Sequence, residues 1–366
     1  MINNLIQQAQ NIFAQLPLPT RATHAWRFGV QPHEVVPQPS DEKPFFKALR
    51  QGVIVTDLRS CAQQFPVIMD QILHAKSWQK EKYAALVEGF WQRSLVVLIP
   101  AGVDVQEPIV LQELLSDFQG NQLIEKIIVI IQAGASATIH DLVSYEHQQV
   151  FRAIDYIVQD GAQCRVVYHQ NASGSTFLFD YTTIIAQANA QVSFECLISG
   201  AQQSKWWPSC HLQGSGSRID LSGAYLLGGN QQCDIISRQH HEARNGISQL
   251  SMNGIVADHA HVVYQGIIHI APNASGTSAD QQNKNILLHE TAKVHSIPSL
   301  EALNNDVQCG HGSAIGHFDQ EQLFYLMARG LPESSAKKLV LESFLLGGIL
   351  NPYLRSVIIQ LVANLA

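Results

Sequence analysis

The amino-acid sequence predicts a mainly β protein whose middle is a parallel β-helix, a solenoid flanked by N-terminal and C-terminal helical segments. A small, a variable and a β-branched residue recur as triplets that end at Ile139, Val166, Val192 and Ile219. These ends are 27, 26 and 27 residues apart, and no helical pattern separates them. Repeats of this length without an intervening helix are typical of a solenoid whose coils stack in register. The periodicity alone leaves a β-sandwich as the alternative.

Short β-branched runs give the second indication of strands. The runs LVVLI (95–99) and IIVII (127–131) are bounded by small and turn-forming residues, which is the pattern of strands between turns. With 46% apolar residues in a chain of 366, there is enough material for a large core. We expect the β-helix core to cover residues 95–318.

Residues 1–94 are predicted to form a mainly helical N-terminal region. Apolar residues over 2–16 fall at helical spacing and stop at Pro17, which predicts an amphipathic helix. Residues 20–44 are rich in proline and polar residues, so we expect an irregular connection there. Helical spacing returns over 78–93.

The segment 319–366 is predicted to be a C-terminal helical region. Asp319 and Gln322 have the spacing of a capping box that opens a helix, and further helices are expected over 333–346 and 350–365. Their apolar residues exceed what a terminal hairpin needs to hold itself to a solenoid, so we expect some to bind a partner and deletion of the segment to leave the solenoid folded. The alternative is that all of them only cap its end. The residues concerned are Leu323, Phe324, Tyr325, Leu326, Leu339, Phe344 and Leu345.

Charge and hydropathy exclude two classes of partner. A formal net charge of -7 gives no basic surface for a phosphate backbone, so we expect no nucleic-acid partner. The N-terminus carries no basic residue before Arg21 and does not have the pattern of a secretory signal. The longest apolar runs fall far short of the roughly 18 residues that span a bilayer. We therefore expect a cytoplasmic protein without a membrane partner.

Motifs for the common enzyme classes are missing from the sequence. The phosphate-binding P-loop, the Rossmann glycine fingerprint, G-x-S-x-G and H-E-x-x-H do not occur. This favours a scaffold or binding role over catalysis. Any ATP chemistry would have to come from a partner.

Cysteine and histidine are the candidate metal ligands. The six cysteines are scattered without a C-x-x-C pair, and for most of them we expect a buried, apolar role. His240, His241, His259 and His261 are expected to be hydrogen-bonded histidines of the solenoid wall. The remaining candidates are Cys309, His311 and His317.

Cys309 and His311 are the strongest candidate site. Residues two apart on a strand share a face, so an extended segment would present sulfur and nitrogen side by side. Both are ligands for iron or zinc. Gly310 and Gly312 would let another backbone or a ligand approach closely.

Four stretches resemble the SufB/SufD family, and they are residues 254–270, 278–288, 298–301 and, most specifically, 305–331. Weaker similarity lies in A-W-R-F (25–28), with its aromatic residues Trp26 and Phe28, and in residues 100–109. The Cys-x-His-Gly form at 309–312 is similar to the SufD branch, whereas the SufB branch has His-Glu-Ala there. The chain departs from the family in its shorter length, its faint N-terminal match and Gly310, where relatives usually have serine or threonine.

The resemblance implies a right-handed β-helix that acts as a non-catalytic scaffold in iron–sulfur cluster assembly. It implies that the chain pairs with a SufB-like subunit and that the C-terminal helices dock a SufC-like ATPase. A transient iron–sulfur cluster would form at the boundary with SufB, with His311 as a ligand and Cys309 as a neighbouring thiol. Whether a flavin joins the complex, and whether the isolated chain forms a homodimer, stay open.

Two other functions would fit a β-helix with many histidines. A polysaccharide-active enzyme would need paired carboxylates and aromatic platforms, but acidic residues between 120 and 300 do not cluster. A stand-alone metal-dependent hydrolase would use the histidine pairs and would retain stoichiometric zinc.

Overall fold

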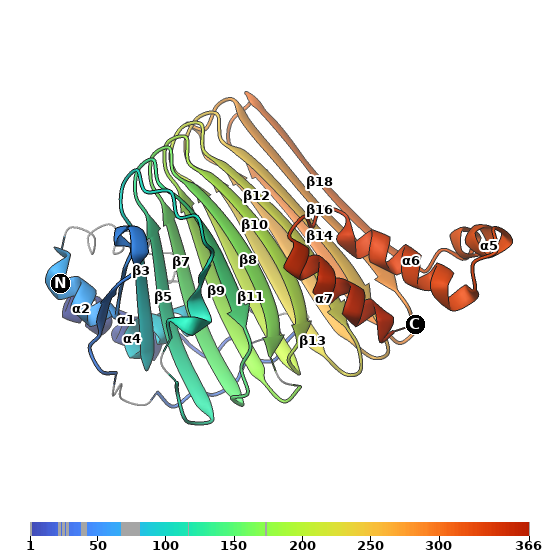
Figure 1. Ribbon diagram of the computed structural model, residues 1–366, viewed down its shortest axis with the longest axis horizontal. Coiled ribbons are helices and arrows are strands. Elements are labelled where there is room, and N and C mark those ends of the chain that lie inside the picture. Colours follow the sequence, from blue (N-terminus) through green and yellow to red (C-terminus); the bar gives the residue numbers. More distant parts are fainter. Residues whose placement is uncertain are drawn as a thin grey trace.

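The computed structural model describes residues 2–20, 23, 26, 29–37, 42–66, 81–115, 117–172 and 174–365. Two facing sheets form a solenoid in which each coil gives one strand to each sheet (Figure 1). The ten-stranded sheet runs in the order β1 (Phe46–Ala48), β2 (Ile54–Thr56), β3 (Arg93–Ile99), β5 (Gln122–Ile131), β7 (Gln149–Val158), β9 (Phe177–Ala186), β11 (Gln203–Leu212), β13 (Gln232–His241), β15 (His261–Ile270), β17 (Lys293–Ala302). The eight-stranded sheet runs β18 (Val307–His317), β16 (Thr277–Leu287), β14 (Ile247–Val256), β12 (Arg218–Leu227), β10 (Gln191–Gly200), β8 (Gln163–Ala172), β6 (Ser136–Val143), β4 (Ile109–Val110).

Strand pairing confirms the predicted parallel β-helix and rules out the β-sandwich. From β3 onward, neighbouring strands of both sheets pair in parallel with the strand one coil away. The offset between paired residues grows from 26 between Phe177 and Gln203 to 32 between His261 and Lys293. The coils are therefore shortest in the middle of the solenoid, since the first pair, β3 with β5, is also offset by 32 residues.

The predicted register is confirmed at two of the three steps. Ile139 pairs with Val166, and Val192 pairs with Ile219. The middle step was wrong by two residues, since Val166 pairs with Phe194 instead of Val192. A shift of two keeps the same side chains pointing inward, so alternation in the sequence does not reveal it.

Alternating side chains of the two sheets build the main core between them. In β6, every second residue is buried and faces inward. Strands β5 and β9 are almost wholly buried because their outer faces are covered as well. This agrees with the continuous apolar runs of the sequence.

The N-terminal helices α1 (Ile2–Gln15) and α4 (Lys82–Phe90) cover the outer face of the ten-stranded sheet. Trp26 and Tyr83 pack there against aromatic residues of β7 and β9. Residues 78–80 of the second predicted helix and Phe28 lie outside the described residues.

The described residues before β3 include two short strands that were not predicted. The short strands β1 and β2 form an antiparallel pair, and β2 continues antiparallel to β3. Helix α2 (Leu58–Gln64) and the 3-10 turn η2 (Arg50–Gly52) also lie before β3, and the 3-10 turn η4 (Leu111–Glu113) follows β4. Three-residue strands are too short to show periodicity, so no pattern in the sequence predicted them.

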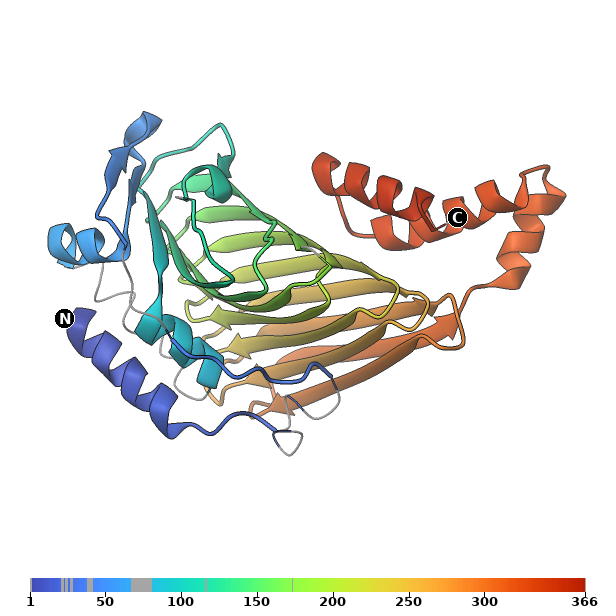
Figure 2. The same cartoon turned by 90° about the horizontal axis from the view of Figure 1, so that it is seen from below.

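The C-terminal helices are α5 (Gln320–Ala328), α6 (Glu333–Leu346) and α7 (Pro352–Ala363). Asp319 caps α5, as predicted, by accepting backbone N–H bonds from Glu321 and Gln322. Helices α6 and α7 lie on the outer face of the eight-stranded sheet, and α5 projects beyond the solenoid (Figure 2). Among the helices of the described residues, none combines the length and apolar character needed to cross a membrane.

Candidate functional site

The last coil leaves both sheets with an exposed edge. Strands β17 and β18 are the final strands in the order of their sheets, and within the described ranges each pairs on one side only. Most residues of both strands are exposed, in contrast to the buried strands before them. The open edges carry backbone N–H and C=O groups that another chain could pair with.

Cys309 and His311 lie on β18, so the extended geometry that the sequence analysis required is present. Cys309 pairs in register with Ala279, and His311 pairs with Gln281. Cys309 is partly buried and packs against the apolar group around Ala279, whereas His311 is exposed. Both side chains therefore stand on the inward-facing side of the last strand, at the mouth of the solenoid.

Gly310 and Gly312, which flank His311 on this strand, face the other way. A Cβ on Gly310 would lie 3.3 Å from Asp280 Oδ1, and one on Gly312 would lie 4.0 Å from Gln282 Cγ. These distances are close or ordinary contacts, so neither glycine is there to relieve a collision within this chain. The outer side of β18 around His311 is bare backbone that an approaching chain can reach.

Gln281 is the residue of β16 that pairs in register with His311, and it was not among the predicted site residues. Its side chain is 1% exposed, and neither polar atom of the amide has a hydrogen-bond partner in the described part of the chain. Gly266 on β15 gives room for this amide, because a Cβ there would collide with it. Gln281 lies one coil before His311 in the sequence. Its position next to His311 can be predicted only when the length of that coil is known.

The other histidines are held in the solenoid wall. His240 faces outward between His211 and His269, with ring centroids 4.7 and 5.7 Å away, and desolvation lowers its pKa to about 3. His241 faces inward, its Nε2 is 2.7 Å from Ser248 Oγ, and burial lowers its pKa to about 4. Adjacent residues of a strand point to opposite faces. His240 and His241 therefore cannot bind one metal ion together.

His259 and His261 also fail to form a joint site. His261 is near His295, with ring centroids 5.2 Å apart, while the N–H of His259 bonds the carbonyl of Gly229 in a turn. No group of three or more histidine, cysteine, aspartate or glutamate side chains in the described ranges is placed to hold a metal ion.

Five of the six cysteines are buried, as expected. Burial raises the pKa of Cys61 to about 11 and that of Cys164, Cys210 and Cys233 to about 12. These groups stay protonated thiols, which are poor metal ligands and poor nucleophiles. Cys309 is the sixth and is partly exposed.

The seven apolar residues predicted for the C-terminal helices divide into two groups. Leu345 is fully buried against the eight-stranded sheet, Leu323 is buried, and Phe344 is partly buried. Phe324, Tyr325 and Leu339 are 74%, 57% and 46% exposed, and Leu326 is intermediate. The idea that all seven cap the solenoid end is wrong, since α6 and α7 lie along a sheet face.

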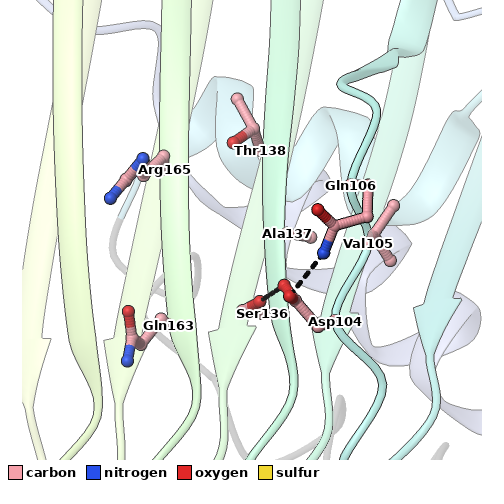
Figure 3. A pocket seen from close by; sticks show the side chains of 8 residues that line it. All are labelled: Asp104, Val105, Gln106, Ser136, Ala137, Thr138, Gln163 and Arg165. Carbon is pink, nitrogen blue, oxygen red and sulfur yellow. Dashed lines mark hydrogen bonds between the residues drawn. The ribbon is translucent and has the colours of Figure 1, made fainter.

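A separate pocket of about 420 Å³ lies at the N-terminal part of the eight-stranded sheet (Figure 3). It is lined by polar side chains, and Asp104 accepts hydrogen bonds from Ser136 and Gln106. Asp104 is the sole carboxylate among its lining residues, and no aromatic ring is among them. This pocket lacks the carboxylate pair and platform that a polysaccharide-active enzyme would need.

Comparison with known proteins identifies the family. Residues 114–344, more than half of the chain, match the model described as "SUF system FeS cluster assembly, SufBD core domain". The iron–sulfur cluster assembly protein SufB of Bacillus subtilis is 25% identical over 308 residues, which cover 81% of this chain and 64% of that protein. The protein SufD of Escherichia coli is 24% identical over 272 residues, covering 73% of this chain and 64% of that protein.

Both branches of the family are thus similar to this chain at almost equal identity. A SufBD family protein of Staphylococcus saprophyticus is 23% identical over 268 residues, covering 72% of this chain and 57% of that protein. The chain spans less than two thirds of the length of these curated relatives. With its parallel solenoid and its match over the core, the chain belongs to the SufB/SufD family of iron–sulfur cluster assembly proteins.

Proposed function

We propose that this chain is a non-catalytic, SufD-type scaffold subunit of a cytoplasmic cluster-assembly complex. It pairs with a SufB-like subunit through the open end of the solenoid, and a nascent iron–sulfur cluster forms at that boundary. One observation carries the proposal: Cys309 and His311 stand on one face of an exposed last strand. The relatives' names support cluster assembly, and the Cys-x-His-Gly form supports the SufD type.

His311 is suited to ligate iron of the cargo cluster through a neutral ring nitrogen. Cys309 supplies a thiol two residues away on the same face. These are two ligands, so the SufB-like chain would provide the others. The exposed edge and the bare backbone at Gly310 and Gly312 allow that chain to come close.

The surface for a SufC-like ATPase is proposed to be helix α5. Phe324 and Tyr325 are exposed side by side in sequence, and Met327 and Leu331 add 41% and 36% exposed apolar side chains. Leu339 on α6 extends the surface. The helix projects away from the solenoid (Figure 2), so a partner could reach it without displacing core contacts.

The decisive experiment is His311→Ala in cells that depend on this complex for clusters. We expect the variant to fold and to co-purify with the SufB-like and SufC-like chains, but to abolish cluster formation. Cys309→Ser should show a smaller defect. His317→Ala is the matched control, because His317 is exposed on the same strand but six residues away, roughly 20 Å along it. Normal cluster formation with His311→Ala would refute the ligand role.

A further inference from the structure

Gln281 is a buried amide whose hydrogen-bonding groups are unused. A buried amide without a partner is unfavourable compared with a bonded one, so each such group needs an explanation. Gln281 lies in β16, is 1% exposed and has no partner for either polar atom among the described residues. Its neighbour on the same strand, Gln282, faces the outer side and is partly exposed.

Of the two residues in register with Gln281, one is polar. In the coil before it, the in-register residue is Leu250, which is apolar and buried. Across the lumen the amide lies against Gly266, and the residue in register with Gly266 in the last coil is Pro298, which has no N–H to donate. In register on the open side is His311.

We propose that Gln281 is the positioning residue for His311, an inference that rests on the proposed function. The amide oxygen accepts the N–H of one ring nitrogen, which fixes the tautomer and the orientation of the imidazole. The other ring nitrogen then keeps its lone pair for iron and faces the open end. A neutral imidazole has one donor and one acceptor nitrogen, and ligating histidines commonly have such an orienting partner.

This role explains why an amide is kept where a filler would be apolar. A parallel sheet stacks the side chains of paired residues on the same face, about 4.8 Å apart, so a glutamine under a histidine is within reach of the ring. The missing side chain at Gly266 leaves the space that the amide occupies. Burial also keeps water away from this acceptor.

The test compares Gln281→Met with Gln282→Met, which changes the same residue type on the opposite face of the same strand. The methionine side chain is similar in shape to that of glutamine but has no N–H or C=O group. Since methionine fills the same space and the proposed bond reaches an exposed ring, we expect the melting temperature of Gln281→Met to stay close to that of the wild type. A large fall in melting temperature would show a structural role and overturn the proposal.

The direct readout is the ring-nitrogen NMR spectrum of the full chain with ¹⁵N-labelled histidine, at a pH where a free imidazole is neutral. The His311 signals are identified by their loss in His311→Ala. We expect one dominant tautomer in the wild type and in Gln282→Met, and a mixture in Gln281→Met. Gln281→Glu, which keeps an acceptor, should restore the single tautomer. Equal tautomer populations in the wild type and Gln281→Met would overturn the proposal.

The cellular readout separates this inference from the proposed function. Gln281→Met should lower cluster formation about tenfold, with the complex still assembled. If His311→Ala forms clusters normally, the proposed function fails, whereas the NMR comparison still shows whether Gln281 holds the ring. If His311 is required but the tautomer does not respond to Gln281, this inference alone fails.

Discussion

The two ends of the solenoid are finished in opposite ways. At the N-terminal end, β2 and β1 cover the edge of β3, and α2 packs beside them. At the C-terminal end, β17 and β18 are left exposed. The ten-stranded sheet thus ends on this side in the three-residue strand β1, which limits unwanted strand pairing, whereas the long edges at the C-terminal end are suited to a partner. We call these the closed and the open end.

Two buried polar groups, Arg152 and Gln281, also differ between the two ends. Near the closed end, Arg152 is fully buried and its guanidinium bonds Asp180 at 2.7 Å, Asp141 at 2.6 Å and Glu125 at 3.3 Å. Near the open end, the amide of Gln281 has no partner within the described residues. The Arg152 guanidinium is thus satisfied by carboxylates of this chain, whereas the Gln281 amide is left for another group.

The largest loss of stability should follow the removal of Arg152, near the closed end. Arg152→Met leaves buried carboxylates without their cation, so we expect a loss of about 4 kcal/mol in the free energy of unfolding, measured with urea. Arg218→Met is the control, since the Arg218–Asp220 pair is exposed and should contribute under about 1 kcal/mol. Equal losses for the two variants would contradict the contrast.

A smaller effect is expected when the open end is changed. Ile315 is 45% exposed on β18, and Ile315→Ser should leave stability nearly unchanged in the free chain. If a SufB-like chain covers this strand, the lost burial of about 2 kcal/mol weakens the pairing about thirtyfold in Kd. The control is Leu350→Ser, which removes a residue that is 79% exposed but distant in the fold. Unchanged affinity for Ile315→Ser would show that the open end is not the interface.

The smallest effect is expected at α5, which belongs to neither end. Phe324→Ala should weaken binding of the SufC-like ATPase about tenfold, while pairing at the open end and stability stay the same. Phe46→Ala on β1, where Phe46 is 49% exposed, is the matched control. Both affinities can be measured by titration with the purified partners. Loss of SufB pairing in Phe324→Ala would contradict the separation of the two surfaces.

Point substitutions test α5 better than the deletion suggested by the sequence. Removing residues 319–366 would uncover Val167, Leu197 and Ile255, which α6 and α7 now bury. We therefore expect that truncated chain to be destabilised or to aggregate, contrary to the expectation from the sequence.

The sequence predicted the repeat because stacked coils need the same inward pattern in each turn. It predicted the common face of Cys309 and His311 because residues two apart on a strand point the same way. It did not predict the register between β8 and β10, since a shift of two residues preserves alternation. It also did not predict the burial of Gln281 or Arg152, because the sequence does not show whether a polar residue is buried or exposed.

The order of the two ends along the chain has a consequence for synthesis. The covered edge of β3 lies early in the sequence and the bare edge of β18 lies late. A repeat protein can fold by adding coils to a formed one, and chains emerge from the ribosome N-terminus first. Each new coil can then pair with a coil that is already folded. The exposed edge of β18 forms only when most of the solenoid is folded, which shortens the time available for aggregation.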